Sequence, residues 1–278
     1  MDVNEIYLVL VLYKTSLEDS KTINSLENIL EERVNLLVFD NSPERQYESE
    51  KFNYKKFNIE YYHDLTNPGL STAYNHALDI AYKSRYSWLL LLDQDTTFTK
   101  MFFDDIKELR VEKLPSSVVA IIPRVVSQSE SKSISPVKIY PGGVCRPLNP
   151  LVGEISAPIS GINSGTMLRV SYMNSINGFS KEYSLDMLDH WYFRRIFQDR
   201  KSIYILESNI LQDLSVFGNF EENVSFVRYQ QMLKSELLFI KEEGFISQMI
   251  FKFRLISRII KQLKYKNKEY YKFTISQL

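Results

Sequence analysis

Apolar runs alternate with amphipathic stretches along the first part of the chain. Residues 6–13 form one continuous apolar run, which is typical of a strand buried on both faces of a parallel sheet. The same reasoning predicts further strands at 36–39, 88–92 and 118–122. Between these strands, apolar residues recur with helical spacing over 20–33, 71–83 and 101–111. Strands that alternate with helices indicate βαβ units and a mostly parallel sheet, which is the α/β class of fold.

The pattern changes after Pro123. Residues 124–162 are rich in Ser, Pro and Gly, which predicts irregular or mixed-sheet structure. The elements predicted next are a strand at 165–170, a helix at 185–199 and short strands at 203–206 and 210–211. From Glu222 onward helical spacing dominates. We therefore predict an α/β domain over residues 1–220 and a C-terminal helical extension over residues 221–278.

The composition is that of an ordinary globular chain, with 44% hydrophobic and 24% charged residues among 278. The single cysteine, Cys145, excludes an intramolecular disulfide framework and a multi-cysteine zinc site. The chain opens without the pattern of a signal peptide. Its longest apolar stretches are strand-sized and shorter than the roughly 20 residues that span a bilayer. These features favour a cytoplasmic protein.

Charge is balanced over the whole chain but not along it. The 34 basic and 34 acidic residues cancel, yet residues 251–278 carry eight basic residues and one acidic residue. This asymmetry indicates an anionic partner for the tail, and we expect no nucleic-acid partner. Because the basic residues are mixed with large apolar ones, we expect residues 245–278 to contact an anionic membrane surface. The alternative is a terminal helix that packs on the preceding domain with a solvated basic rim.

Polar residues gather where the predicted strands end. Asp40 follows one strand, Asp93-Gln94-Asp95 follows another, and Asn67-Pro68-Gly69 precedes a helix N-terminus. Ligands of open α/β sheets bind at the carboxyl ends of the strands, and helix N-termini attract phosphate. Two carboxylates one residue apart on an extended segment point to the same side, and such hard oxygen ligands favour Mg²⁺ or Mn²⁺ with a diphosphate. Taken singly, each cluster also reads as a turn or a helix entry.

In this order the clusters carry a family resemblance. The N-terminal 200 or so residues resemble the inverting glycosyltransferases of family 2, and especially their rhamnosyltransferase-like branch. The segments that carry the resemblance are 10–13, 38–42, 67–75, 90–95, 163–168, 177–179 and 185–189. The Leu-Leu-Asp-Gln-Asp form at 91–95 is the most specific of them. The resemblance implies a GT-A fold, a Rossmann-like nucleotide-binding arrangement with a mostly parallel sheet, here followed by the helical extension.

The resemblance also implies roles for individual residues. Those assigned to the nucleotide sugar are Tyr13, Asp40 at the base, Asn67 and Gly69 beside the ribose and diphosphate, and Asp93. Asp95 and Asp93 are the expected metal ligands. Asp189 matches the general base that deprotonates the acceptor hydroxyl. Asp186 shares a helical face with Asp189, so either can be the base, although we expect Asp186 to be the helix N-cap.

One departure from the family pattern concerns the metal site. Many relatives carry a His just before a Gly near the end of the catalytic domain, and this chain has Asp213 in the comparable stretch. An Asp can ligate a hard cation as well as a His can, so Asp213 is a further expected metal ligand. The alternative is a surface turn residue.

These features predict an inverting, metal-dependent hexosyltransferase that uses Mn²⁺ or Mg²⁺ and a dTDP- or UDP-sugar donor. The sugar suggested by the branch is rhamnose, with a UDP-hexose as the alternative, and the acceptor is a glycan or a lipid-linked molecule in surface polysaccharide synthesis. Such an enzyme would be cytoplasmic or peripheral on the inner face of the cell membrane. A nucleotidyltransferase or NAD(P) oxidoreductase is disfavoured because residues 12–16 contain no glycine. A non-catalytic sugar-nucleotide binding module is the remaining alternative.

Overall fold

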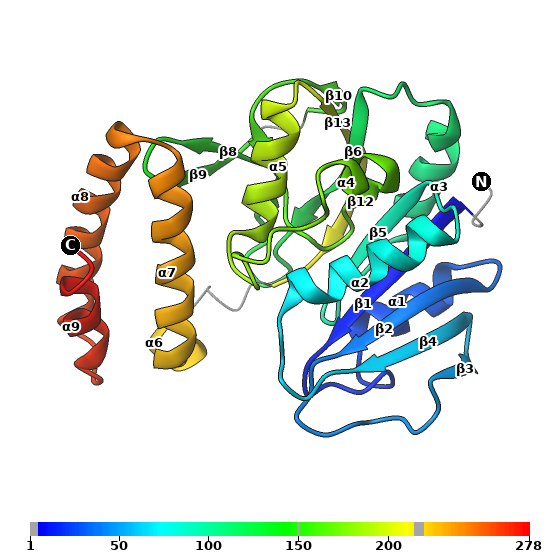
Figure 1. Cartoon of the computed structure of the whole chain (residues 1–278), viewed down its shortest axis with the longest axis horizontal. Coiled ribbons are helices and arrows are strands. Elements are labelled where there is room, and N and C mark those ends of the chain that lie inside the picture. Colours follow the sequence, from blue (N-terminus) through cyan, green and yellow to red (C-terminus); the bar gives the residue numbers. More distant parts are fainter. Residues whose placement is uncertain (1–4, 149–150, 214–219) are drawn as a thin grey trace. The chain divides into compact units, whose positions relative to one another are not determined.

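The computed structural model describes residues 5–148, 151–213 and 220–278. It divides into two compact units (Figure 1). The first comprises Met1–Pro136 and Pro147–Asp213, and the second comprises Val137–Arg146 and Leu214–Leu278. The second unit thus takes a short segment from the middle of the chain in addition to its end. A boundary between catalytic domain and extension at residue 220 stays a prediction.

The first unit is built on a mixed, mostly parallel sheet with the strand order β10-β13-β6-β12-β5-β1-β2-β4-β3, in which β7 pairs with β6. Strand β1 lies between β2 and β5 and is parallel to both, and β12 is antiparallel to its two neighbours. The bounds of its strands are β1 (Ile6–Leu12), β2 (Val34–Asp40), β3 (Lys51–Tyr54), β4 (Phe57–His63), β5 (Trp88–Asp93), β6 (Val118–Val126), β7 (Ser133–Ser135), β10 (Gly153–Ile155), β12 (Met167–Arg169) and β13 (Ser202–Leu211). The short strand β11 (Ile159–Ser160) lies outside this sheet.

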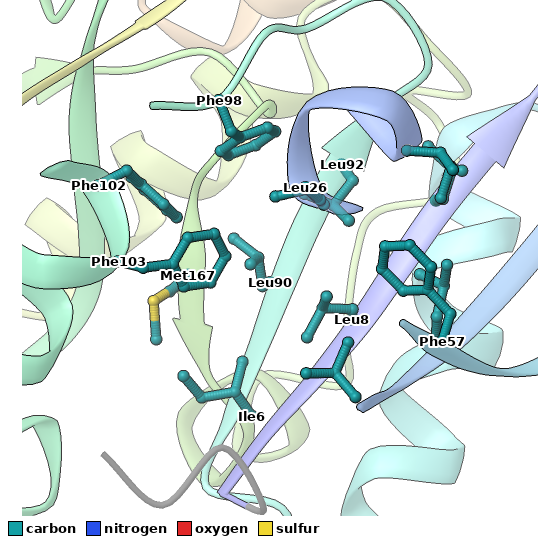
Figure 2. Packing of buried hydrophobic residues seen from close by; sticks show 14 of the residues in the cluster. Ile6, Leu8, Leu26, Phe57, Leu90, Leu92, Phe98, Phe102, Phe103 and Met167 are labelled. Atoms are coloured by element: carbon teal, nitrogen blue, oxygen red, sulfur yellow. The ribbon is translucent and has the colours of Figure 1, made fainter. Parts of the chain in front are cut away.

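Helices cover both faces of this sheet. Side chains from α1 and α3, such as Leu26 and Phe102, pack on the face of β1 and β5 that presents Leu8 and Leu90 (Figure 2). On the opposite face, α2 packs against β1, β5 and α4. The helices of this unit are α1 (Lys21–Ile29), α2 (Leu70–Lys83), α3 (Lys100–Leu109), a 3-10 turn (Val111–Lys113), α4 (Val170–Ser175) and α5 (Leu188–Gln198). Burial on both faces explains why β1 and β5 are continuously apolar in sequence.

The sequence patterns located the central strands and missed the edge. Strands β3 and β4 were not predicted, although β4 alternates buried and accessible residues along its length. The two short strands expected at 203–206 and 210–211 are one strand, β13, whose pairing with β6 is irregular between Ile205 and Asn209. Helix α1 ends at Ile29 and not at residue 33, because Leu30 already has extended backbone angles.

The second unit is mostly helical. Its described elements are β8 (Val137–Tyr140), β9 (Val144–Pro147), α6 (Phe220–Asn223), α7 (Phe226–Glu242), α8 (Phe245–Gln262) and α9 (Glu269–Ile275). Helices α7, α8 and α9 contact one another. Buried aromatic rings of Tyr229 and Tyr270 join α7 to α9, with ring centroids 5.3 Å apart. Among the described residues, no helix is long and apolar enough to cross a membrane.

Candidate active site

The ends of three parallel strands bring the predicted polar residues to one edge of the sheet. In the register of the sheet, Leu12 of β1 lies opposite Asp40 of β2, and Val11 lies opposite Asp93 of β5. Asp40 and Asp93 therefore flank the carboxyl end of β1 on its two sides. This is the edge at which open α/β sheets bind ligands.

Helix α1 holds the backbone of the Asp93-Gln94-Asp95 segment. The hydroxyl of Ser20 donates to the Gln94 carbonyl at 2.9 Å, and the hydroxyl of Thr22 donates to the carbonyls of Asp93 and Thr96. Gln94 itself turns toward the end of β1, where its Oε1 accepts the Tyr13 N–H at 2.8 Å. With the main chain and the middle residue fixed in this way, the two aspartates project from a rigid turn.

Gln212 joins the two aspartates. Its Nε2 donates to Asp93 Oδ2 at 3.1 Å and to Asp95 Oδ1 at 3.0 Å. The neighbouring Leu211 and Thr97 exchange two backbone hydrogen bonds, which bring the end of β13 against this turn. Gln212 is buried, and its Oε1 has no hydrogen-bond partner. The amide nitrogen thus offsets part of the repulsion between two carboxylates, and the amide oxygen is a buried acceptor without a partner.

The surroundings of Asp93 favour its neutral form. Burial, together with the nearby Asp95 and Asp189 carboxylates, raises the pKa of the Asp93 carboxyl to about 7. Burial likewise raises the pKa of the Tyr74 and Tyr192 hydroxyls, with Asp93 and Asp189 adding to the effect. The Asp93 and Asp189 carboxylates therefore both raise the pKa of Tyr74 and of Tyr192. Asp189 thus lies near the Asp93-Asp95 pair.

Asp189 lies in the first turn of α5, where its Oδ1 accepts its neighbour's N–H, that of His190, at 2.7 Å. The helix begins at Leu188, and its N-cap is Met187 in the left-handed conformation. The prediction that Asp186 is the N-cap is therefore wrong. A turn that needs a positive φ at Met187 shifts the start of the helix by one residue, and it leaves Asp189 at the helix N-terminus, where a negative charge is stabilised.

Asp40 is fully buried and bonded within the protein. Its Oδ1 accepts the Ser42 N–H at 2.9 Å, and its Oδ2 accepts the Tyr61 hydroxyl at 2.6 Å and the Gln46 amide at 3.1 Å. Burial, followed by this hydrogen bond to Asp40, raises the pKa of Tyr61 to about 12. Through these hydrogen bonds, Asp40 fixes the conformation of the loop after β2. Tyr13, in contrast, is exposed at the end of β1.

The loop before α2 is anchored to residue 184. Gly69 is the N-cap of α2 with φ +90°, and a Cβ built there would lie 2.3 Å from the Ser184 carbonyl oxygen. That oxygen accepts the Leu70 N–H at 2.6 Å, so the first turn of α2 is satisfied from within the protein. Asn67 precedes it with a positive φ of 49°. The two predicted donor-binding residues therefore form a tight bend beside the segment that leads to α5.

Asp213 faces another part of the structure. Its exposed carboxylate accepts hydrogen bonds from the Ser127 hydroxyl at 2.7 Å and from the Ser129 N–H at 3.0 Å. These bonds, the Ser129 N–H first, hold the pKa of Asp213 below its usual value. Of the adjacent residues Gln212 and Asp213, it is Gln212 that contacts Asp93 and Asp95. The sequence patterns did not indicate Gln212, because its place beside the aspartates depends on the pairing of Leu211 with Thr97.

The residues at this edge suit a hard divalent cation. Among the described residues, no group of three or more His, Cys, Asp or Glu side chains is arranged so that it could hold a metal ion by itself. The ligand set available is the Asp93 and Asp95 carboxylates together with the buried, unpaired Oε1 of Gln212. Carboxylate and amide oxygens are what Mg²⁺ and Mn²⁺ bind, and these ions commonly complete their shell with water and substrate phosphates. The donor set therefore fits such an ion bound together with a diphosphate.

A mostly parallel sheet with paired aspartates at its carboxyl edge and a further acid on a following helix is the architecture of a GT-A glycosyltransferase. The family model "Glycosyl transferase family 2" matches residues 20–167, more than half of the chain. The chain belongs to this family. The predicted family and fold class are thus confirmed, and the rhamnosyltransferase-like branch stays a prediction. A search of curated protein sequences gives no significant match.

Solved structures support the fold. TarS of S. aureus, residues 1–349 in complex with UDP, is 13% identical with a TM-score of 0.53, and the match covers 95% of this chain and 76% of TarS 1–349. GalNAc-T7 with UDP, GalNAc and Mn²⁺ is 11% identical with a TM-score of 0.56, covering 98% of this chain and 54% of GalNAc-T7. At these identities the similarity concerns the fold alone.

Proposed function

We propose that this glycosyltransferase moves a sugar from a nucleoside diphosphate donor to an acceptor hydroxyl with inversion at the anomeric carbon. The observation that carries the proposal is the convergence of Asp93, Asp95 and Asp189 at one edge of the sheet, close enough for their charges to influence the same groups. Inversion in one displacement needs a base on the acceptor side and charge neutralisation on the leaving diphosphate. The arrangement supplies a residue for each task.

Asp189 is the proposed general base. It lies in the first turn of α5, and one of its oxygens is fixed by the His190 N–H, which leaves the other for the acceptor hydroxyl. Asp189 would take the hydroxyl proton as the acceptor oxygen attacks the anomeric carbon and the nucleoside diphosphate leaves from the opposite side. Asp186, three residues earlier and outside the helix, is the alternative base that the sequence left open.

Asp93 and Asp95 are the proposed metal ligands, with Mn²⁺ or Mg²⁺ as the ion. When bound, the ion would neutralise charge on the leaving diphosphate. GalNAc-T7, which shares the fold, has been solved with Mn²⁺. Asp213 was the third ligand expected from the sequence, but its bonds to Ser127 and Ser129 favour Gln212 in that place. Rotating the Gln212 amide by half a turn would put Oε1, in place of Nε2, on the side that faces Asp93 and Asp95.

The nucleotide would lie along the ends of β1 and β2. We assign Tyr13, which is exposed there, to the base or ribose, and we assign Asn67 and Gly69 to the ribose and diphosphate side. Asp40 would support the base through the loop that it holds. TarS has been solved with UDP and with UDP-GlcNAc, which favours a UDP-sugar as donor. A dTDP-sugar such as dTDP-rhamnose is the second donor to test.

The acceptor is a glycan or a lipid-linked molecule in surface polysaccharide synthesis, and we place the enzyme in the cytoplasm, peripheral to the inner face of the cell membrane. The basic, apolar C-terminal segment supports this location, because a lipid-linked acceptor presents its sugar at that surface.

A thermal-shift screen of UDP-, dTDP- and GDP-sugars with and without Mn²⁺ tests the donor. We expect one nucleotide to raise the melting temperature only when the metal is present. Turnover and the anomeric configuration of the product, read by NMR, then test the reaction. Binding of a sugar nucleotide without transfer or slow hydrolysis would contradict the enzyme and favour a binding module.

A further inference from the structure

Helix α8 exposes a continuous row of large apolar side chains. Ile246, Met249, Phe253, Ile256, Ile260 and Leu263 are between 40% and 70% exposed, and they follow one another at alternating spacings of three and four residues. Residues spaced in this way lie along one side of a helix. We call this row the α8 stripe. An apolar row of this length in water is typical of an interaction surface.

The stripe is distinct from the side of α8 that the protein itself buries. Phe251, Leu255 and Gln262 lie on the other side of the helix and are almost fully buried within the second unit. On the same buried side, Arg258 makes a bidentate ion pair with Glu236 of α7, with distances of 2.7 and 3.0 Å. The helix is therefore anchored to its own unit without using any member of the stripe.

Within α8 and the turn that follows it, the charged residues beside the stripe are all cations. Lys252 and Lys264 lie one helical turn from Ile256 and Ile260 respectively, and both are exposed. From Gly244 to Lys268 the chain has seven Lys or Arg residues and no Asp or Glu. A surface that combines exposed apolar residues with lysines and lacks carboxylates is complementary to a layer with an apolar interior and negatively charged head groups.

The same charges argue against a second copy of the chain as the occupant. Two α8 stripes facing each other would bring Lys252, Lys261 and Lys264 of one copy near the equivalent lysines of the other. Neither copy has a carboxylate on this segment to pair with them, and like charges flanking a helical seam are destabilising. An anionic lipid surface meets both the apolar and the charge requirement.

We infer that the α8 stripe docks on an anionic membrane surface, with α8 lying in the plane of the interface, its apolar residues among the upper acyl chains and its lysines at the head groups. The inference rests on the proposed peripheral location and is independent of the transfer reaction. Its failure leaves the assignment of Asp93, Asp95 and Asp189 untouched.

The test is sedimentation of the full chain with vesicles of phosphatidylcholine, with and without phosphatidylglycerol, in the absence of donor. We expect binding to the anionic vesicles only, weakened by added salt. The double variant Phe253→Glu/Ile260→Glu should bind at least about tenfold less tightly, because it places two charges in the apolar face. Both positions are exposed, so the circular dichroism spectrum and the melting temperature should match those of the wild type.

The matched control is Val227→Glu/Ile275→Glu. It introduces the same two charges at exposed apolar residues of the same unit, 63% and 50% exposed, outside the stripe. We expect this control to bind vesicles as the wild type does. Equal vesicle binding by the stripe variant and the wild type would overturn the inference. So would analytical ultracentrifugation that shows a dimer which the stripe variant converts to a monomer, since the stripe would then be a protein interface.

Discussion

The Gln212 amide nitrogen lies 3.0 Å from one carboxylate oxygen of Asp95, and it donates a second hydrogen bond to Asp93. One neutral side chain from the end of β13 thereby bridges two acids that repel each other. A hydrogen bond to a charged group is stronger than one between neutral groups. Removing the Gln212 amide would therefore leave both carboxylates without this hydrogen-bond donor. Gln212 therefore stabilises the protein before any ligand binds, and rotation of its amide would present the unpaired Oε1 to a cation held by the two aspartates.

Gln212→Ala should reduce both properties. We expect the free energy of unfolding in EDTA to fall by about 1–3 kcal/mol through loss of the shared donor. Mn²⁺-dependent nucleotide binding should weaken by at least about tenfold, the usual effect of losing a group that supports a metal site. Denaturant titration and isothermal titration calorimetry measure the two. Asp213→Asn is the control, and it should leave nucleotide affinity unchanged; the reverse pattern would restore Asp213 as the ligand.

Asp93→Asn should stabilise the protein without metal, and more so at high pH. The pKa of Asp93 is about 7 in the folded protein against 3.8 for an ordinary Asp. Folding is therefore penalised increasingly as the pH rises from about 4 to 7, and the penalty is constant above that range. Because Asp93 keeps some accessible surface, we expect Asn to add about 2 kcal/mol at pH 8 and less at pH 5.

Chemical denaturation in EDTA at the two pH values measures the effect of Asp93→Asn. Asp79→Asn, on the exposed side of α2, should change the unfolding free energy by less than about 0.5 kcal/mol at either pH. A loss of stability in Asp93→Asn at pH 8 would show that the carboxylate is stabilised, not strained, by its surroundings. Mn²⁺ with nucleotide should stabilise the wild type alone.

The sequence predicted the centre of this molecule because burial on both faces leaves a clear pattern. Strands β1 and β5 are continuously apolar, and the polar residues begin where the strands end. Strand β4 has buried residues at Phe57, Ile59 and Tyr61 alternating with accessible ones, a signal that was available and not used. Strand β3 has the same alternation, but over only four residues and with Phe52 and Tyr54 no more than partly buried, so its pattern is short and weak.

Sequence motifs suggested the candidate residues that lie in local segments, and they did not suggest the one that depends on distant pairing. Asp93, Asp95 and Asp189 were chosen as candidates from motifs, but the contact of Gln212 depends on the pairing of Leu211 with Thr97. Adjacent residues of an extended segment point to opposite sides, so a choice between 212 and 213 is decided by that pairing. Composition and spacing contain no information on it. A hydrogen-bonded ladder between remote segments has to be seen in three dimensions.

Asp189→Asn should abolish transfer and leave donor binding intact. The variant keeps the size and the helix position of the side chain but cannot accept a proton, and a positioned general base contributes about 10²–10⁴-fold to the rate. We expect kcat to fall by that amount while the Kd for the donor with Mn²⁺ is unchanged. Asp186→Asn is the comparison, and it should retain most activity. Loss of activity in Asp186→Asn alone would exchange the two roles.

Gly69→Ala should destabilise the fold through two separable effects. Gly69 and Gly244 are both helix N-caps with nearly the same backbone angles, φ 90° and ψ −175° against φ 95° and ψ 178°. This region of backbone conformation is open almost only to glycine, and another residue there costs about 1–3 kcal/mol. A Cβ at Gly244 would meet nothing within 4 Å, whereas one at Gly69 would lie 2.3 Å from the Ser184 oxygen. Gly244→Ala therefore measures the backbone strain alone.

The two variants differ in what the added methyl group displaces. At position 69 it must move the Ser184 carbonyl, which accepts the first N–H of α2, so the helix end and the segment leading to Asp189 shift together. We expect Gly69→Ala to cost at least about 1 kcal/mol more than Gly244→Ala in denaturant titrations, and to lower kcat while Gly244→Ala leaves it unchanged. Equal losses of stability with full activity in both would mean that the bend at Gly69 only starts a helix and does not position the site.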